Sequence, residues 1–202
     1  MQDVLDGYRR AADRDFVDRY EALSSAEVYA PVREFLPDRT LRVADIGAGT
    51  GRDAAWFAAQ GHRVTAVEPV AELREAGRAR HADCDIDWVD DRLPRLSVLA
   101  GKGPFDLVTL CAVWQHLDES ARAVALPVIA RLLTIGGRLI VSLRHGPGGE
   151  GRRVFPISVD ATLAEALRAG LIVQHRVEAP SIQAGNRALG VSWTWLVLEK
   201  GG

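Results

Sequence analysis

The chain has 202 residues, of which 48% are hydrophobic and 26% are charged, so its length and composition fit one globular domain with its own core. The net charge of −2 gives no global attraction to nucleic acid or to an acidic membrane surface, and no apolar run reaches membrane-spanning length. The two cysteines, Cys84 and Cys111, lack metal-ligand spacing, so we expect reduced thiols in a cytoplasmic protein and no bound metal.

The first 38 residues predict short amphipathic helices, which Pro31 and Pro37 limit. All three tyrosines of the chain, Tyr8, Tyr20 and Tyr29, lie in this segment. Tyrosine carries an apolar ring and a polar tip, so we expect these side chains to pack with their hydroxyl groups in water.

A strand–turn–helix–strand unit follows, which is the building block of a parallel α/β sheet. An apolar strand, Leu41–Ile46, leads into glycines at positions 47, 49 and 51, then a helix over Arg52–Gln60 and a second strand over Arg63–Val67. The glycines let the backbone approach a ligand closely, and the helix N-terminus favours a negative group. Glu68, at the end of the second strand, is placed to bind a ribose hydroxyl. The unit therefore predicts a nucleoside site.

Two residues of the turn indicate which nucleoside binds. Arg52 occupies the position of the third glycine of a dinucleotide-binding turn. Asp45, two residues before Gly47, would repel a pyrophosphate but attract a sulfonium or ammonium group. S-Adenosylmethionine is a nucleoside with such a cationic tail, and its carboxylate can use the helix N-terminus beyond Gly51. An NAD-dependent oxidoreductase is the alternative that these residues disfavour.

The middle of the chain continues the alternation of helices and strands. We expect a helix over Val70–Arg80, a strand over Ile86–Val89 that ends at Asp90 and Asp91, and a buried strand over Phe105–Leu110. A helix over Glu119–Leu133 and a fifth strand over Arg138–Leu143 follow.

The last third begins with a glycine-rich, basic stretch, residues 144–153, which is either a substrate-side loop or a plain connector. Asp160 is placed to cap a helix that ends near Ala169. Strands over Leu171–Val177 and Val191–Leu198, joined by a short connection, predict an antiparallel hairpin. Trp193 and Trp195 face one side of its second strand, where we expect them to cover the core.

The segment Asp45-Ile-Gly-Ala-Gly-Thr-Gly resembles the first motif of class I S-adenosylmethionine-dependent methyltransferases. The resemblance extends through Glu68, Phe105–Leu110 and Leu132–Val141. It implies an α/β, three-layer αβα sandwich with a seven-stranded, mostly parallel sheet in the order 3-2-1-4-5-7-6, whose last strand is antiparallel. It also implies one domain over 1–202: a helical N-terminal cover (1–38), a cofactor-binding core (39–143), and a substrate-side loop with the C-terminal hairpin (144–202).

The same resemblance implies a cofactor site for S-adenosylmethionine, with S-adenosylhomocysteine as its product. In this family an acid after the third strand accepts a hydrogen bond from the adenine, and either Asp90 or Asp91 fits. The positions that correspond to cofactor-binding residues of the family are Asp45, Gly47, Ala48, Gly49, Gly51, Glu68, Pro69, Asp90, Asp91, Cys111, Ala112 and Val113.

The reaction that the family implies is an in-line displacement at a methyl carbon, so alignment supplies much of the acceleration and a base is needed only for a protonated acceptor. His116 and His145 follow the fourth and fifth strands and are the candidate bases, although His116 could instead only order its loop. Arg144, Arg152 and Arg153 are candidates for binding an acidic small-molecule acceptor. A non-catalytic module that binds S-adenosylmethionine is the second alternative.

Overall fold

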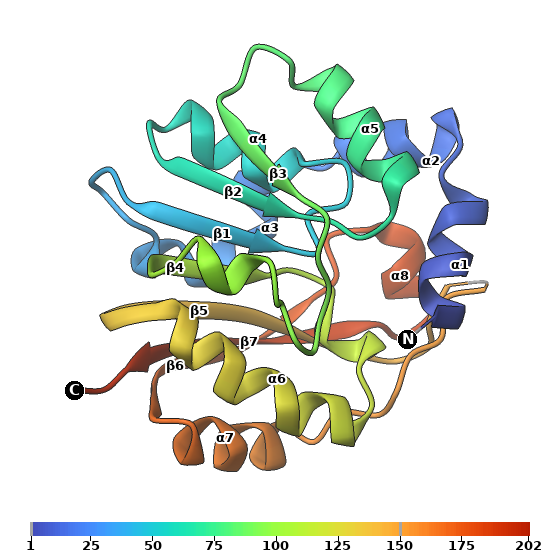
Figure 1. Ribbon diagram of the computed structural model, residues 1–202. Helices are drawn as coiled ribbons and strands as arrows, with labels where there is room; N and C mark the ends of the chain where they lie inside the picture. The colour runs from blue at the N-terminus through green and yellow to red at the C-terminus, as the bar shows by residue number, and fades with distance from the viewer. Residues whose placement is uncertain (1, 150) are drawn as a thin grey trace.

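The computed structural model describes residues 2–149 and 151–202. Its centre is a seven-stranded sheet in the order β3-β2-β1-β4-β5-β7-β6, with helices on both faces (Figure 1). Strand β7 is antiparallel to both of its neighbours, while β1 to β5 pair in parallel. The expected fold and strand order are confirmed. The strands are β1 (Arg42–Ile46), β2 (Arg63–Val67), β3 (Ile86–Val89), β4 (Phe105–Leu110), β5 (Leu133–His145), β6 (Leu171–Pro180) and β7 (Ser192–Lys200).

The N-terminal segment is helical, as expected. Its first two helices lie beyond the carboxyl ends of the parallel strands (Figure 1), whereas its last part, Ala30–Phe35, packs against β6 and β7. The backbone N–H of Phe16 donates to the Asp13 side chain, which caps the second helix. Among the described residues, no helix has the length and apolar character needed to cross a membrane. The segment comprises α1 (Gln2–Ala11), α2 (Arg14–Glu21), α3 (Ser25–Val28) and a 3-10 helix (Ala30–Phe35).

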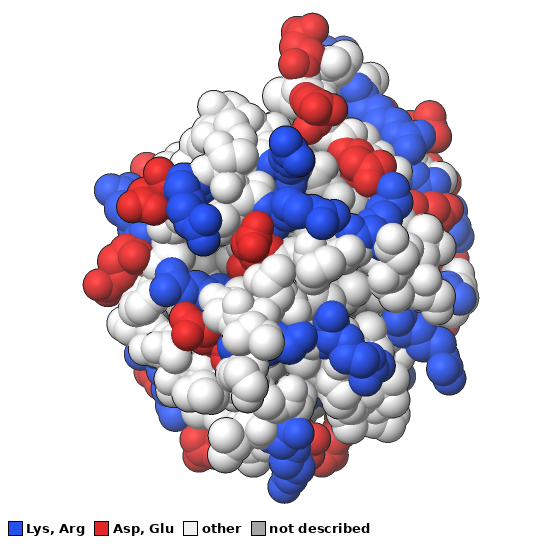
Figure 2. Space-filling model, turned by 60° about the vertical axis from the view of Figure 1, so that its left-hand side comes forward, with Lys and Arg blue, Asp and Glu red and all other residues white. Residues whose placement is uncertain are grey.

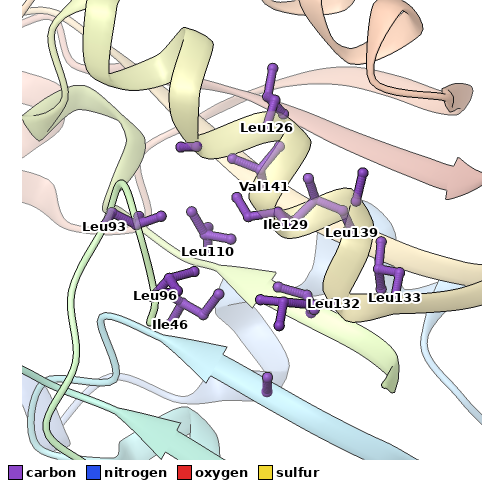
Figure 3. Packing of buried hydrophobic residues seen from close by; sticks show 14 of the residues in the cluster. Ile46, Leu93, Leu96, Leu110, Leu126, Ile129, Leu132, Leu133, Leu139 and Val141 are labelled. Carbon is purple, nitrogen blue, oxygen red and sulfur yellow. The ribbon is translucent and has the colours of Figure 1, made fainter. Parts of the chain in front are cut away.

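Four further α-helices cover the two faces of the sheet. Strand side chains alternate between these faces, so one strand serves both cores. In β4, Val108 packs into the core beneath α6 and α7. Leu126 and Ile129 of α6 belong to the same core (Figure 3). Leu107 packs on the opposite face with Phe57 of α4. These helices are α4 (Arg52–Ala59), α5 (Ala71–Arg80), α6 (Glu119–Leu132) and α7 (Val159–Arg168). The last helix, α8 (Ala184–Ala188), lies between β6 and β7 in the chain.

The expected hairpin of β6 and β7 is confirmed, with one added element, whereas two other local expectations were wrong. The connection between β6 and β7 contains a helix, α8. The Arg187 side chain of this helix donates hydrogen bonds to the Ser181 and Ile182 carbonyl groups of the preceding loop, which hold the helix in place. Strand β5 begins at Leu133 rather than Arg138, because Gly136 has a φ of +74° and absorbs an irregularity in the pairing with β4. The cap of α7 is Ser158, whose hydroxyl accepts from the backbone N–H of Ala161, while Asp160 lies in the first turn.

Candidate cofactor and acceptor site

Two cavities lie beyond the carboxyl ends of the parallel strands, one of about 340 Å³ and one of about 120 Å³. Strand β1 pairs with β2 on one side and with β4 on the other, so the order of the strands reverses at β1. Open α/β sheets bind ligands at such a reversal. The cavities share a wall formed by the cover helices, the glycine turn and the loop after β4. The shared residues include Tyr8, Gly47, Gly49, Cys111, Ala112 and His116.

The three glycines of the turn all have positive φ, but they serve different purposes. A Cβ added at Gly47 would lie 2.5 Å from Val113, and one added at Gly51 would lie 2.6 Å from the Trp88 ring, so these two glycines permit packing. A Cβ added at Gly49 would have no neighbour within 4 Å, and Gly49 lines both cavities. Gly49 is therefore the glycine that leaves room for a ligand.

Glu68 lies in the wall of the smaller cavity with only 5% of its surface exposed. Its carboxylate accepts hydrogen bonds of 2.8 Å from the backbone N–H groups of Gly49 and Val70. Burial is the main cause that raises the pKa of Glu68 to about 7, and these hydrogen bonds oppose it. Each carboxylate oxygen keeps a lone pair for a further donor, which suits a pair of ribose hydroxyls.

Asp45 lies in the wall of the larger cavity and is also buried. The Thr109 hydroxyl donates to it at 2.8 Å, and burial, followed by the charge of Asp53, raises its pKa. Asp53 itself is held by the Arg52 guanidinium through two contacts of 2.8 Å. Asp45 has no such cation among residues 2–149 and 151–202, so it suits a positively charged ligand group.

The structure separates the two acids after β3. Asp91 lines the smaller cavity, but its carboxylate accepts from the backbone N–H groups of Arg92, Val98 and Leu99, which orders its own loop. Asp90 lies outside that wall, where its 68% exposed side chain forms an ion pair with Arg74 at 3.1 Å. The rest of the smaller cavity is largely apolar and includes Pro69, Val70, Leu73, Leu93 and Val113.

The loop after β4 brings Cys111 and Ala112 to the shared wall. Ala112 has a φ of +58°, a conformation that non-glycine residues rarely adopt, and the Ser142 hydroxyl accepts its backbone N–H at 2.8 Å. Burial raises the pKa of the Cys111 thiol far above its usual range. Cys111 is therefore a small wall residue and not a nucleophile.

His116 is held in one tautomer by its neighbours. Its Nδ1 lies 2.7 Å from the Arg153 carbonyl oxygen, which only accepts, so Nδ1 carries the proton. Its Nε2 lies 3.0 Å from the Tyr8 hydroxyl, which therefore donates to it. Burial is the main cause that lowers the pKa of His116, and the charges of Arg152 and Arg144 lower it further. The imidazole is thus neutral, with a basic nitrogen toward the shared wall.

Tyr8 is a site residue that the sequence did not reveal. Its hydroxyl forms a hydrogen bond with His116 at the shared wall rather than pointing into water. Burial raises the pKa of Tyr8 well above the usual value. The gathering of all three tyrosines in the cover segment was the one available signal.

Of the other candidates, the structure brings Arg144 and Arg152 to the larger cavity but not His145 or Arg153. Arg144 and His145 are consecutive on β5, so their side chains point to opposite faces, and His145 forms a 2.8 Å hydrogen bond with the Thr194 hydroxyl. Arg153 is exposed and stacks on the Phe155 ring, 4.5 Å from its centroid.

The wall of the larger cavity opposite the glycine turn is aromatic and amide-rich. Trp193 and Trp195 of β7 line it, beside the core that they were expected to cover. The Arg144 guanidinium lies 5.4 Å from the Trp193 ring centroid and 3.3 Å from the Asn186 side-chain oxygen of α8. Helix α8, which the sequence did not predict, therefore forms part of the site.

The sheet order, the glycine turn and the acid after β2 define a class I methyltransferase fold. Residues 43–137 match the family described as a methyltransferase domain. The chain is 35% identical over 103 residues to the ubiquinone biosynthesis O-methyltransferase of Xylella fastidiosa, covering 50% of this chain and 41% of that protein. It is 32% identical over 112 residues to an uncharacterized methyltransferase of Mycobacterium tuberculosis, of which the match covers 40%. The chain thus spans less than half of the curated relatives that it matches.

Solved structures with the same fold cover more of the chain. The 1,6-didemethyltoxoflavin-N1-methyltransferase of Burkholderia thailandensis, with bound 1,6-didemethyltoxoflavin and S-adenosylhomocysteine, aligns with a TM-score of 0.67 at 24% identity over 88% of this chain and 76% of that one. A TehB-like SAM-dependent methyltransferase from Corynebacterium glutamicum aligns with a TM-score of 0.69 at 22% identity over 92% and 96%. The fold that the sequence motifs predict is confirmed.

Proposed function

We propose that this chain is an S-adenosylmethionine-dependent methyltransferase that acts on a small molecule, with residues 1–202 working as one domain. The observation that carries the proposal is the pair of cavities with a shared wall. The smaller cavity combines an apolar lining with Glu68, which suits an adenosine, and the larger combines Asp45 with space for an acceptor. Gly49 leaves open space between them.

The residues fit the cofactor one by one. Glu68 would bind the ribose, and Pro69, Leu93 and Val113 would enclose the adenine. Asp45 would face the ammonium group through water or the glycine turn, and Cys111, Ala112 and Ala48 would line the methionine part. When bound, S-adenosylmethionine supplies a methyl group on a positively charged sulfur, so the protein has only to align the acceptor and manage its proton.

We assign that proton transfer to His116 together with Tyr8. The Arg153 carbonyl fixes the proton on His116 Nδ1 and leaves Nε2 to accept. The Tyr8 hydroxyl would take a proton from the acceptor while it passes its own to Nε2, so no separate charge develops on tyrosine. The alternative is that the pair only holds α1 against the loop after β4, and the kinetics of variants distinguish the two roles.

The acceptor that we propose is small and acidic. Arg144 and Arg152 line the larger cavity, and arginine matches carboxylate and phosphate groups. On the face drawn in Figure 2, basic and acidic side chains are interspersed rather than forming a continuous basic surface, which does not favour nucleic acid. The two free cysteines fit a reducing compartment, so we place the protein in the cytoplasm.

Binding and turnover test the proposal separately. Calorimetry should detect binding of S-adenosylmethionine and S-adenosylhomocysteine but not of NAD. Transfer of a labelled methyl group to members of a metabolite panel should then identify acceptors. Binding of NAD in place of S-adenosylmethionine would overturn the proposal. Tight cofactor binding with no turnover on any acceptor would favour the non-catalytic module.

A further inference from the structure

The larger cavity holds more positive charge than its acids balance. The charge of Arg52 is balanced by Asp53, and burial opposes ionisation of the other acid, Asp45. Arg19, Arg144 and Arg152 line the same cavity and form no ion pair with a carboxylate of residues 2–149 and 151–202. Guanidinium groups that are partly shielded from water bind oxyanions strongly.

Arg152 has a buried donor without a hydrogen-bond partner, whereas the Arg19 side chain is exposed to water. The buried donor of Arg152 is its Nε, and its Nη1 makes only a long contact of 3.4 Å to the Tyr20 hydroxyl. Arg144, by contrast, donates from Nε and Nη2 to the Pro147 carbonyl at 3.0 and 2.7 Å. A buried donor without a partner costs free energy that a ligand can recover.

Aromatic rings place the Arg152 guanidinium beside the Tyr8–His116 pair. Its central carbon lies 5.4 Å from the Tyr8 ring centroid and 5.3 Å from that of Phe16. The Tyr8 hydroxyl is in turn 3.0 Å from His116 Nε2. An oxyanion on Arg152 would therefore lie close to the hydroxyl that receives the acceptor's proton, which leaves space for only a short spacer within the acceptor.

Resting on the proposed methyl transfer, we propose that Arg152 selects acceptors in which a carboxylate or phosphate and the reacting oxygen or nitrogen are attached to the same carbon atom or to neighbouring ones. Arg152 binds the oxyanion, and the short spacing then brings the reacting atom to Tyr8. A longer spacer carries that atom past the shared wall.

Matched isomers test the spacing. The probes are ortho- and para-hydroxybenzoate, which have the same size and charge, and ortho- and para-hydroxyphenyl phosphate as the phosphate arm. Each is titrated into the protein saturated with S-adenosylhomocysteine, and each is offered as an acceptor with S-adenosylmethionine. We expect the ortho isomer of at least one pair to bind about tenfold more tightly than its para isomer, and only the ortho isomer to be methylated. The arm that responds identifies the oxyanion.

Arg152→Gln tests the residue, and Arg131→Gln is the control because Arg131 is exposed on α6 and lines neither cavity. Arg152→Gln should weaken binding of the preferred ortho acid, and raise its KM, by about tenfold or more while the affinity for S-adenosylhomocysteine stays unchanged. Arg131→Gln should change neither. Equal acid binding in both variants, preference for a para isomer, or no acid binding despite S-adenosylhomocysteine binding would overturn the inference. Failure of S-adenosylhomocysteine to bind would instead refute the proposed function, and this inference with it.

Discussion

Cofactor binding should depend on pH through Glu68, because burial raises the pKa of this carboxyl to about 7. The ribose hydroxyls are donors, so the ionised form of Glu68 is the one that binds them best. With that pKa, about nine tenths of the free protein carries protonated Glu68 at pH 6 and about one tenth at pH 8. The apparent Kd for S-adenosylhomocysteine should therefore be about tenfold higher at pH 6 than at pH 8.

Calorimetric titration of wild type and Glu68→Gln at both pH values isolates this contribution. Glu68→Gln should lose the tenfold ratio, whereas the exposed control Asp83→Asn should keep it. Asp45 also faces the site with a raised pKa, so the difference between wild type and Glu68→Gln is the quantity that reports on Glu68.

Glu68→Ala measures how much the hydrogen bonds between the Glu68 carboxylate and the ribose contribute to cofactor binding. Glu68→Ala removes two hydrogen bonds to a charged group, which is roughly 2–4 kcal/mol of binding free energy at pH 8. An unchanged affinity in Glu68→Ala, or a pH ratio in Glu68→Gln equal to that of wild type, would remove Glu68 from the ribose site.

Four further substitutions test other parts of the molecule. Gly49→Val should abolish cofactor binding, because the branched side chain enters the open space of the site from a residue with a φ of +59°. Circular dichroism should show no loss of helix. Normal cofactor binding in this variant would show that the turn does not contact the ligand. Gly77→Ala should lower the free energy of unfolding in urea by about 1–3 kcal/mol, since the added Cβ would collide with Trp88 and the Thr50 carbonyl. His116→Ala and Tyr8→Phe should each lower kcat, His116→Ala by about a hundredfold or more, with unchanged cofactor affinity. If neither slows turnover, the pair has no part in proton transfer.

The parts of the fold that depend on local signals could be predicted from the sequence. The glycine turn, the helix that begins at Arg52 and the acid after β2 lie within a short stretch, where turn chemistry and hydrophobic periodicity determine the structure. The buried run of β4 is equally local. Once these elements are recognised as class I methyltransferase motifs, the strand order follows, and the sheet confirms it.

The orientation of side chains at the end of β5 could not be predicted, because it depends on the partner strand. A strand that ends at Leu143 leaves both Arg144 and His145 in a loop, where either can face the cleft. Pairing with β7 continues through His145, opposite Ser192, and this pairing imposes the alternation of faces. Only Arg144 then reaches the larger cavity.

Contacts between distant residues account for the other omissions. Tyr8 and His116 are separated by 108 positions, and no periodic pattern connects a helix in the cover to a loop after β4. Helix α8 is only five residues long and contains a glycine, so its intrinsic preference for a helix is weak. Its hydrogen bonds to the loop after β6 stabilise it in the folded protein.

The side chains of Tyr8, His116 and Arg152 are joined by direct contacts. Tyr8 contacts both His116 and the Arg152 guanidinium, and a Cβ at Gly7 would collide with the Gly151 carbonyl, so α1 and the basic loop fit directly together. The position of the base and that of the anion-binding group are therefore coupled through one tyrosine ring. For this reason, effects of Tyr8→Phe and Arg152→Gln on turnover should not be additive, although each residue would act on a different part of the acceptor.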